Sequence, residues 1–226
     1  LPGDRVGLTD LRRVMAARGY QEAMTYSFID PELDTAFAGG RAGLALSNPI
    51  SSNLAVMRQS LWPGLCQALH HNRNRQHQRV RLFETGVRFI LQGNELNEKN
   101  VIAAVASGER YPEQWDIAAE PMDMFDISAD LQALFRLGGH AEDITIHATE
   151  DPALRPGRAG EIRRGRRRIG LVGELHPRLV QQLELDDAPV MFEIDAEAAM
   201  AAQPPAFKGV SRFPSVRRDL ALVVPE

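Results

Sequence analysis

Residues 47–90, SNPISSNLAVMRQSLWPGLCQALHHNRNRQHQRVRLFETGVRFI, decide the fold that this chain is expected to adopt. The stretch opens as a turn, because the Ser and Asn side chains of 47–53 can hydrogen-bond their own backbone. Ser60 is a good N-cap, and Pro63 fits the first turn of a helix, where no backbone donor is needed. Apolar residues then recur at steps of three and four over 61–69. These features predict a helix with one buried face.

The chain after this helix is first polar and basic and then extended. Residues 72–79 are rich in Arg, Asn, Gln and His. Two apolar runs follow at 80–83 and 87–90, with the pattern of a β-strand. The stretch therefore predicts a basic connection after the helix, followed by a strand that carries Glu84 and Gly86 into the centre of the domain.

Length and charge limit the class of protein. The chain has 226 residues and a net charge of −4, which suits one large domain, or one and a half smaller ones, and argues against a dedicated DNA- or RNA-binding module. The single cysteine, Cys66, lies on the apolar helix stripe, so no internal disulfide forms and a buried thiol in a reducing cytosol is expected. The chain shows no signal-like segment and no apolar run of about 20 residues, so we expect a soluble protein without a membrane partner. Its first residue is Leu1, and we expect an excised fragment.

The remaining sequence mixes helical and extended patterns. Thr9 is expected to cap the first helix, which Gly19 ends, and Met24, Tyr26 and Phe28 alternate along a strand over 22–29. The run at 101–107 is unbroken and apolar, as in a strand buried on both faces. The other expected elements are helices at 32–37, 126–137 (capped by Asp126 or Ser128), 176–185 and 195–202, strands at 44–46, 144–148 and 190–194, a loop at 152–157, and a hairpin of 161–164 with 168–174 around Gly165.

Four short motifs in this order resemble one family. They are Ser47-Asn48-Pro49, Met57-Arg58-Gln59-Ser60-Leu61, Asn72-Arg73-Asn74-Arg75 and Phe83-Glu84-Thr85-Gly86, and together they resemble the synthetase-like core of the bacterial phenylalanyl-tRNA synthetase β subunit. The resemblance implies an α+β fold of the class II aminoacyl-tRNA synthetase type, with a mixed, mainly antiparallel sheet flanked by helices.

The same resemblance implies a domain organisation. Residues 1–8 are expected to be a linker tail and 9–203 the class II synthetase-like core. Residues 204–226 are expected to hold a linker and the first strand of a truncated ferredoxin-like anticodon-binding domain, because 211–220 resemble the opening of that domain.

The nucleotide-binding arginines of class II synthetases are missing at the matching positions. When Phe83-Glu84-Thr85-Gly86 is aligned with the second motif of the class, Ile90 stands where that motif has the arginine that serves the α-phosphate. Arg88 lies two residues away on the same strand face and could replace it. The third motif, Gly-x-Gly-x-x-Arg, has no good match. We therefore expect no catalytic residue and no bound cofactor in this chain, whereas the complex of the family uses ATP and Mg.

Other chemistries find little support. The chain has no CxxC, and its His70, His71 and His77 include no pair four residues apart on one helix face, so no metal site is expected. Glu84 is the one carboxylate expected inside the sheet. It is either functional or structural, in an ion pair or as an acceptor for the backbone, because an unpaired buried carboxylate would be costly.

Two groups of residues could contact partners. Leu11, Val14 and Met15, with Arg18 at the rim, form either intradomain core or a partner-facing seam. The family supports the seam, because its first motif builds the subunit interface, although Tyr26 replaces the proline of that motif. Arg163, Arg164, Arg166 and Arg167 either contact tRNA phosphates or form a solvated hairpin tip.

These observations favour one function and leave alternatives. The first is a catalytically silent, cytoplasmic synthetase-like core that pairs with the catalytic α subunit in an α2β2 phenylalanine–tRNA ligase and is inactive alone. The second is a stand-alone RNA-binding module that uses the basic stretches. The third, an active ATP-dependent ligase, is disfavoured by Ile90.

Overall fold

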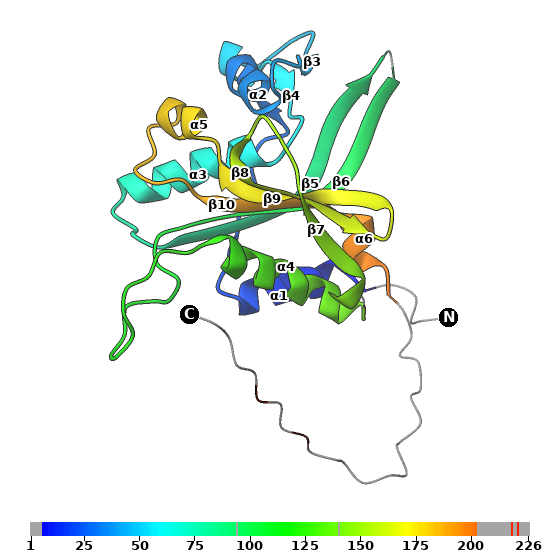
Figure 1. Cartoon of the computed structure of the whole chain (residues 1–226). Helices are drawn as coiled ribbons and strands as arrows, with labels where there is room; N and C mark the ends of the chain where they lie inside the picture. The colour runs from blue at the N-terminus through cyan, green and yellow to red at the C-terminus, as the bar shows by residue number, and fades with distance from the viewer. Residues whose placement is uncertain (1–5, 94, 140, 203–217, 219–220, 222–226) are drawn as a thin grey trace.

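The computed structural model describes residues 6–93, 95–139, 141–202, 218 and 221. A seven-stranded sheet runs through its middle in the order β1-β5-β6-β10-β9-β8-β7, and a three-stranded sheet has the order β2-β4-β3 (Figure 1). The large sheet consists of β1 (Gln21–Glu22), β5 (Val80–Gln92), β6 (Glu95–Ser107), β7 (Ile144–Ala148), β8 (Leu154–Arg164), β9 (Arg167–Leu175) and β10 (Val190–Asp195), and the small sheet of β2 (Phe28–Ile29), β3 (Leu44–Ala45) and β4 (Val56–Met57).

Strand pairing in the large sheet is antiparallel except for β1, which pairs in parallel with β5. The helices are α1 (Leu8–Ala17), α2 (Pro31–Phe37), α3 (Trp62–Asn74), α4 (Met124–Leu137), α5 (Pro177–Gln182) and α6 (Ala196–Met200), with 3-10 turns η1 (Ser52–Leu54) and η2 (Ala141–Asp143). Figure 1 shows α2, α3 and α5 on one side of the large sheet and α1, α4 and α6 on the other. The mixed, mainly antiparallel α+β architecture is confirmed.

The strand β6 explains this three-layer arrangement. Its side chains alternate between the faces of the sheet. Val101, Ala103 and Val105 join the core beneath α3, while Ile102 and Ala104 join the core beneath α4. The unbroken apolar run at 101–107 is thus buried on both faces, as predicted.

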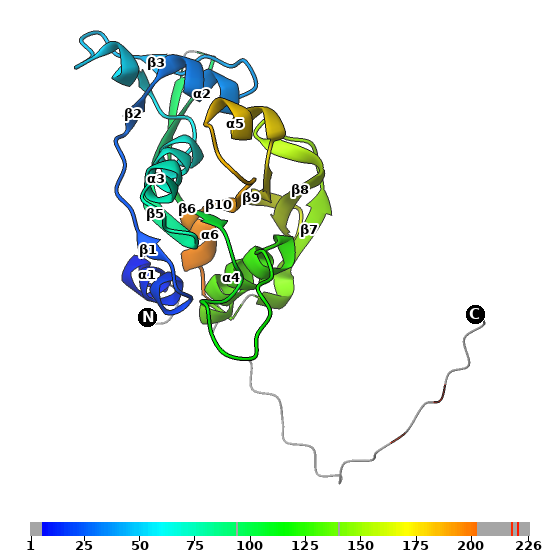
Figure 2. The same ribbon diagram turned by 90° about the vertical axis from the view of Figure 1, so that its left-hand side faces the viewer.

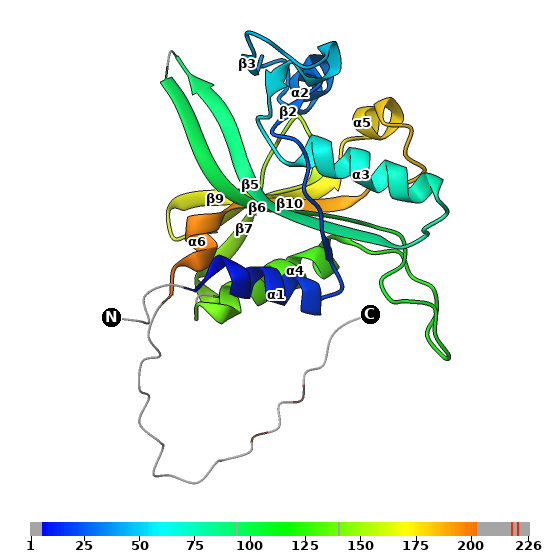
Figure 3. The same cartoon turned by 180° about the vertical axis from the view of Figure 1, so that it is seen from behind.

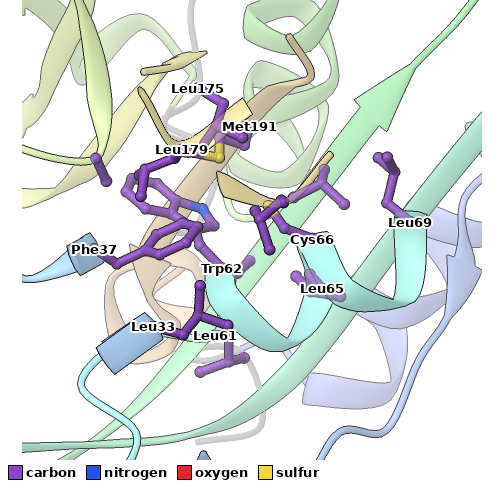
Figure 4. Packing of buried hydrophobic residues seen from close by; sticks show 14 of the residues in the cluster. Leu33, Phe37, Leu61, Trp62, Leu65, Cys66, Leu69, Leu175, Leu179 and Met191 are labelled. Atoms are coloured by element: carbon purple, nitrogen blue, oxygen red, sulfur yellow. The ribbon is translucent and has the colours of Figure 1, made fainter. Parts of the chain in front are cut away.

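The α3 side of the core is built around Trp62 (Figure 4). Its indole N–H donates to the backbone oxygen of Phe192 at 3.0 Å, and Leu61, Leu65 and Leu69 supply the buried stripe predicted from the sequence. Cys66 lies in this stripe as a free, fully buried thiol, and burial raises its pKa to about 12.

The core on the other face of the large sheet packs α1 against α4. Leu11 and Met15 of α1 pack with Leu131 and Leu134 of α4, and all four side chains are fully buried. At the exposed end of α1, Arg18 forms an ion pair with Asp130 of α4.

Several expected boundaries are wrong for local reasons. Helix α1 begins two residues earlier than predicted, with Gly7 rather than Thr9 as its N-cap. Asp123 caps α4 in a capping box with Asp126, so Asp126 is the third helical residue rather than the cap. Ser60 precedes the cap of α3, although its hydroxyl still accepts a bond from the N–H of Trp62 at 3.1 Å.

Strand predictions were also partly wrong. The expected strand over 22–29 divides into β1 and β2, because each end pairs with a different neighbour, β5 and β4 respectively. The expected loop at 152–157 belongs in part to β8, which starts at Leu154. In contrast, β5 and β6 extend further than predicted and form one long hairpin that projects from the body (Figure 1).

The predicted linker and anticodon-domain strand at 204–226 lie outside the described residues, except for Arg218 and Ala221. Most of the predicted tail at 1–8 does so as well. Across the described part of the chain, the longest helices are too short and too polar to cross a bilayer.

Candidate functional site

A cavity of about 470 Å³ opens over the large sheet, bordered by α2, the start of α3 and four central strands. Ile90, the residue in the arginine position, lines it, as does Arg88 from the same strand. The charged lining residues are four cations, Arg41, Arg88, Lys99 and Arg168, and four carboxylates, Asp34, Asp151, Glu193 and Asp195. The sheet thus carries a concave surface at the position suggested by the motif alignment.

Arg88 is held by carboxylates of the neighbouring β10. Its Nη1 donates to Oε1 of Glu193 at 2.8 Å, and its Nη2 lies 3.7 Å from Oδ1 of Asp195. Glu193 also accepts from the Ser60 hydroxyl and the Leu61 N–H, each at 2.8 Å. The guanidinium is therefore part of a network that joins β5, β10 and α3, although its buried Nε has no hydrogen-bond partner among the described residues.

The other three cations of the cavity also have protein partners. The Nζ of Lys99 lies 3.6 Å from Oδ2 of Asp195, and Nε of Arg41 donates to Oε1 of Gln59 at 2.6 Å. Arg168 lies 3.5 Å from Oε2 of Glu161 on the adjacent strand.

Two carboxylates in the cavity are partly desolvated. Burial raises the pKa of Asp34, although the backbone N–H and side-chain amide of Gln59 both donate to it and lower the pKa. Burial likewise raises the pKa of Asp151, opposed by the Ala153 N–H that donates at 3.0 Å and by nearby Arg168 and Arg41.

This charge balance fits a nucleotide poorly. A triphosphate needs cations that are available to it as negative charge develops, whereas each cation here already faces a protein acceptor and four carboxylates share the same lining. Among the described residues, no cluster of His, Cys, Asp and Glu is arranged to hold a metal ion.

Glu84 lies in a buried ion pair rather than in the cavity. Its Oε1 accepts from Nη1 of Arg58 at 2.8 Å, and both side chains are 5% exposed. The ion pair expected for this carboxylate is therefore present. The partner belongs to the Met57–Leu61 motif, so two of the four family motifs meet here.

Exposed apolar side chains gather on the segment between β1 and β2. Met24 is 95% exposed and Tyr26 is 70% exposed, and the Tyr26 ring stacks on Phe28 with centroids 5.9 Å apart. We call Met24, Tyr26 and Phe28 the ridge. Figures 2 and 3 show this segment on the outer side of α3, between α1 and the small sheet. A shallow cavity of about 330 Å³ beside it is lined by Tyr26, Phe28 and residues of η1 and α3.

The residues predicted for a subunit seam divide between core and surface. Leu11 and Met15 are fully buried within the chain, so the intradomain reading describes them. Val14 is half-buried and Arg18 is exposed. Met24, Tyr26 and Phe28 alternate in the sequence as in a strand, but the sequence does not reveal that Met24 and Tyr26 are exposed, because a half-buried strand has the same pattern.

The arginines of the β8–β9 hairpin largely pair with carboxylates of the hairpin itself and of the neighbouring strand β10. Arg163 and Arg168 both face Glu161, and Nη2 of Arg167 lies 3.4 Å from Oδ2 of Asp195. Arg166 is exposed at the hairpin turn, and Arg164 is half-buried in β8. The hairpin is as predicted, and its contact with RNA stays a prediction.

Comparison with known proteins gives the family. Residues 5–196 match the family model described as "Phenylalanyl tRNA synthetase beta chain CLM domain". This chain belongs to that family. It is 47% identical over 98% of its length to the phenylalanine–tRNA ligase β subunit of Pseudomonas putida and 46% identical over 97% to that of Pseudomonas fluorescens. In each case it spans 28% of the relative's length.

A solved structure shows the same fold at low sequence similarity. The pyrrolysyl-tRNA synthetase of Desulfitobacterium hafniense superposes with a TM-score of 0.56 at 14% identity, covering 86% of this chain and 66% of that one. The fold is thus similar to that of a tRNA synthetase.

Proposed function

We propose that this chain is the non-catalytic, class II-like core of a phenylalanyl-tRNA synthetase β subunit and supports the catalytic α subunit during charging of tRNA with phenylalanine. The family match and the relatives support this function. One observation carries the non-catalytic part: Arg88, which lies two residues from Ile90 on the same strand, is held by Glu193 and Asp195.

ATP, Mg and phenylalanine would then bind to the α subunit of an α2β2 complex in the cytoplasm. The charges of the cavity support this assignment of ligands to the α subunit. Its lining has four carboxylates and four cations, and each cation already faces a protein acceptor. Neither the family match nor the relatives support the alternative of a stand-alone RNA-binding module.

The ridge is the best candidate for the docking surface on this chain. Large apolar side chains that are exposed together mark interaction sites, and Met24 and Tyr26 are among the most exposed of the described apolar residues. The docking surface would extend from the ridge to Val14 and Arg18, the more exposed members of the seam proposed from the sequence. The chain leads from the end of α1 directly into the ridge. Leu11 and Met15 would support it from within.

Light scattering of the protein mixed with the α subunit of phenylalanine–tRNA ligase tests this proposal. We expect a complex whose mass equals the sum of both components in equal numbers. The protein alone, and the α subunit alone, serve as controls. Two separate peaks with unchanged masses would contradict the proposed function.

A further inference from the structure

Residues 23–28 carry the ridge and are called the ridge segment. Thr25 lies in the middle of this segment, and its side chain points the opposite way from those of Met24 and Tyr26. Because side chains alternate along an extended chain, Met24 and Tyr26 face outward when Thr25 faces inward. The segment is bound to the sheets at its two ends, where the Ala23 N–H donates to the Phe83 oxygen at 2.8 Å and the Arg58 N–H to the Ser27 oxygen at 2.9 Å.

The Thr25 hydroxyl binds both members of the buried ion pair. It donates to Oε2 of Glu84 at 2.7 Å and accepts from Nη1 of Arg58 at 2.9 Å. The Arg58–Glu84 contact at 2.8 Å closes a triangle of three hydrogen bonds. Nε of Arg58 also donates to the Val87 oxygen at 2.9 Å, which fixes the guanidinium to β5.

Two glycines leave room for this triangle. A Cβ atom on Gly64 of α3 would lie 2.6 Å from the Thr25 hydroxyl oxygen, and one on Gly86 would lie 2.4 Å from Nη2 of Arg58. Such distances are too short for real Cβ contacts, so the side chains would have to move. The close approach of the ridge segment to α3 therefore depends on Gly64. The placement of Arg58 likewise depends on Gly86.

We propose that the Arg58–Glu84–Thr25 triangle is a positioning device that holds the ridge in its docking conformation. The proposal rests on the proposed function, because it assumes that the ridge binds the α subunit. A segment that is already ordered loses less conformational entropy on binding than a loose one. Charge-assisted hydrogen bonds to a buried pair are strong enough to order a short segment.

Thr25→Val tests the triangle, because valine keeps the branched shape and removes the hydroxyl. We expect the Kd for the α subunit to rise about tenfold, which corresponds to about 1.4 kcal/mol. Amide hydrogen exchange over 23–28 should become faster. Thr25→Ser, which keeps the hydroxyl, should stay within twofold of the wild type. Thr149→Val is the matched control, since Thr149 is also half-buried and extended but lies outside the ridge.

Gly64→Ala separates positioning from general stability. Alanine favours the helix, so the change should not lower the stability of α3, yet its Cβ displaces Thr25. We expect weaker binding of the α subunit and faster exchange over 23–28, with a smaller loss in Tm than for Glu84→Ala, because Arg58 and Glu84 remain paired.

The outcomes distinguish the two proposals. If the wild type binds the α subunit and both variants bind within twofold of it, the positioning proposal is wrong and the proposed function stands. The same holds if Tm falls while Kd is unchanged, because the triangle is then only structural. If the wild type itself does not bind, the proposed function fails.

Discussion

The cavity and the ridge begin at neighbouring residues and have opposite character. Arg58 is directed toward the ridge segment, whereas the next two residues, Gln59 and Ser60, line the cavity. In the cavity, charged groups are matched by other groups of the same chain. On the ridge, Met24 and Tyr26 project away from the chain. The proposed function follows this contrast: the fold would hold no nucleotide and would offer a surface to a partner.

The largest expected effect concerns the ion pair beneath the ridge. Glu84→Ala leaves Arg58 buried without its carboxylate partner, and the loss of one member of a buried pair costs about 3–5 kcal/mol. Urea unfolding followed by circular dichroism should show this decrease in the free energy of unfolding. Glu95→Ala, at an exposed position on the β5–β6 hairpin, is the control. A loss below about 1 kcal/mol for Glu84→Ala would argue against a structural role for the pair.

The second prediction concerns Arg88 in the cavity. If this guanidinium stabilises the sheet by binding Glu193 and Asp195, Arg88→Met should lower the free energy of unfolding by about 1.5–3 kcal/mol, as for hydrogen bonds to charged groups. Lys99→Met, which removes a more exposed cation from the same cavity, should cost less. Unchanged or increased stability of Arg88→Met would contradict this stabilising role of the guanidinium.

The third prediction concerns the surface of the ridge. Tyr26→Ala should raise the Kd for the α subunit about 30-fold, which is a typical effect at an interface hot spot, and leave Tm nearly unchanged. Tyr111→Ala is the matched control, because Tyr111 is also an exposed tyrosine, on the loop before α4. Surface plasmon resonance with immobilised α subunit measures both. Equal effects of the two changes would remove the distinction between the ridge and other exposed aromatic surface.

The smallest expected effect is the pH response of the cavity. Burial raises the folded-state pKa of Asp151 above its ordinary value of 3.8, so its charge opposes folding above the folded pKa and ceases to do so below 3.8. Asp151→Asn keeps an acceptor for the Ala153 N–H. It should therefore increase stability at pH 7 by less than about 1 kcal/mol, with the gain disappearing as the pH falls toward 3.8.

Urea unfolding from pH 4 to pH 7 measures this difference. Glu150→Gln, at the exposed neighbouring position, should show no such pH-dependent gain. A gain for Asp151→Asn that is the same at both pH values would mean that desolvation of the carboxylate is not its cause.

Local patterns in the sequence predicted those parts of the fold that local forces determine. The apolar run at 101–107 and the stripe on α3 were identified because their spacing reflects burial directly. Local patterns could not predict contacts between residues that are far apart in the sequence. Arg88 and Glu193 lie 105 positions apart, and nothing near either residue indicates the other.

The exposure of the ridge also depends on contacts that local sequence patterns do not contain. Alternation of Met24, Tyr26 and Phe28 predicted a strand, but a strand also needs neighbours with which to pair. Here β1 pairs with β5 over two residues and β2 with β4 over two, so the residues between them are extended without a ladder. Only the arrangement of the sheets shows that these apolar side chains are exposed.

The ATP–pyrophosphate exchange reaction with phenylalanine tests the central claim most directly. The protein alone should give no exchange above the buffer rate, because each cation of the cavity already faces a protein acceptor, whereas the mixture with the α subunit should be active. Exchange by the protein alone that disappears in Arg88→Ala would contradict the account, since Arg88 would then serve a nucleotide rather than Glu193 and Asp195.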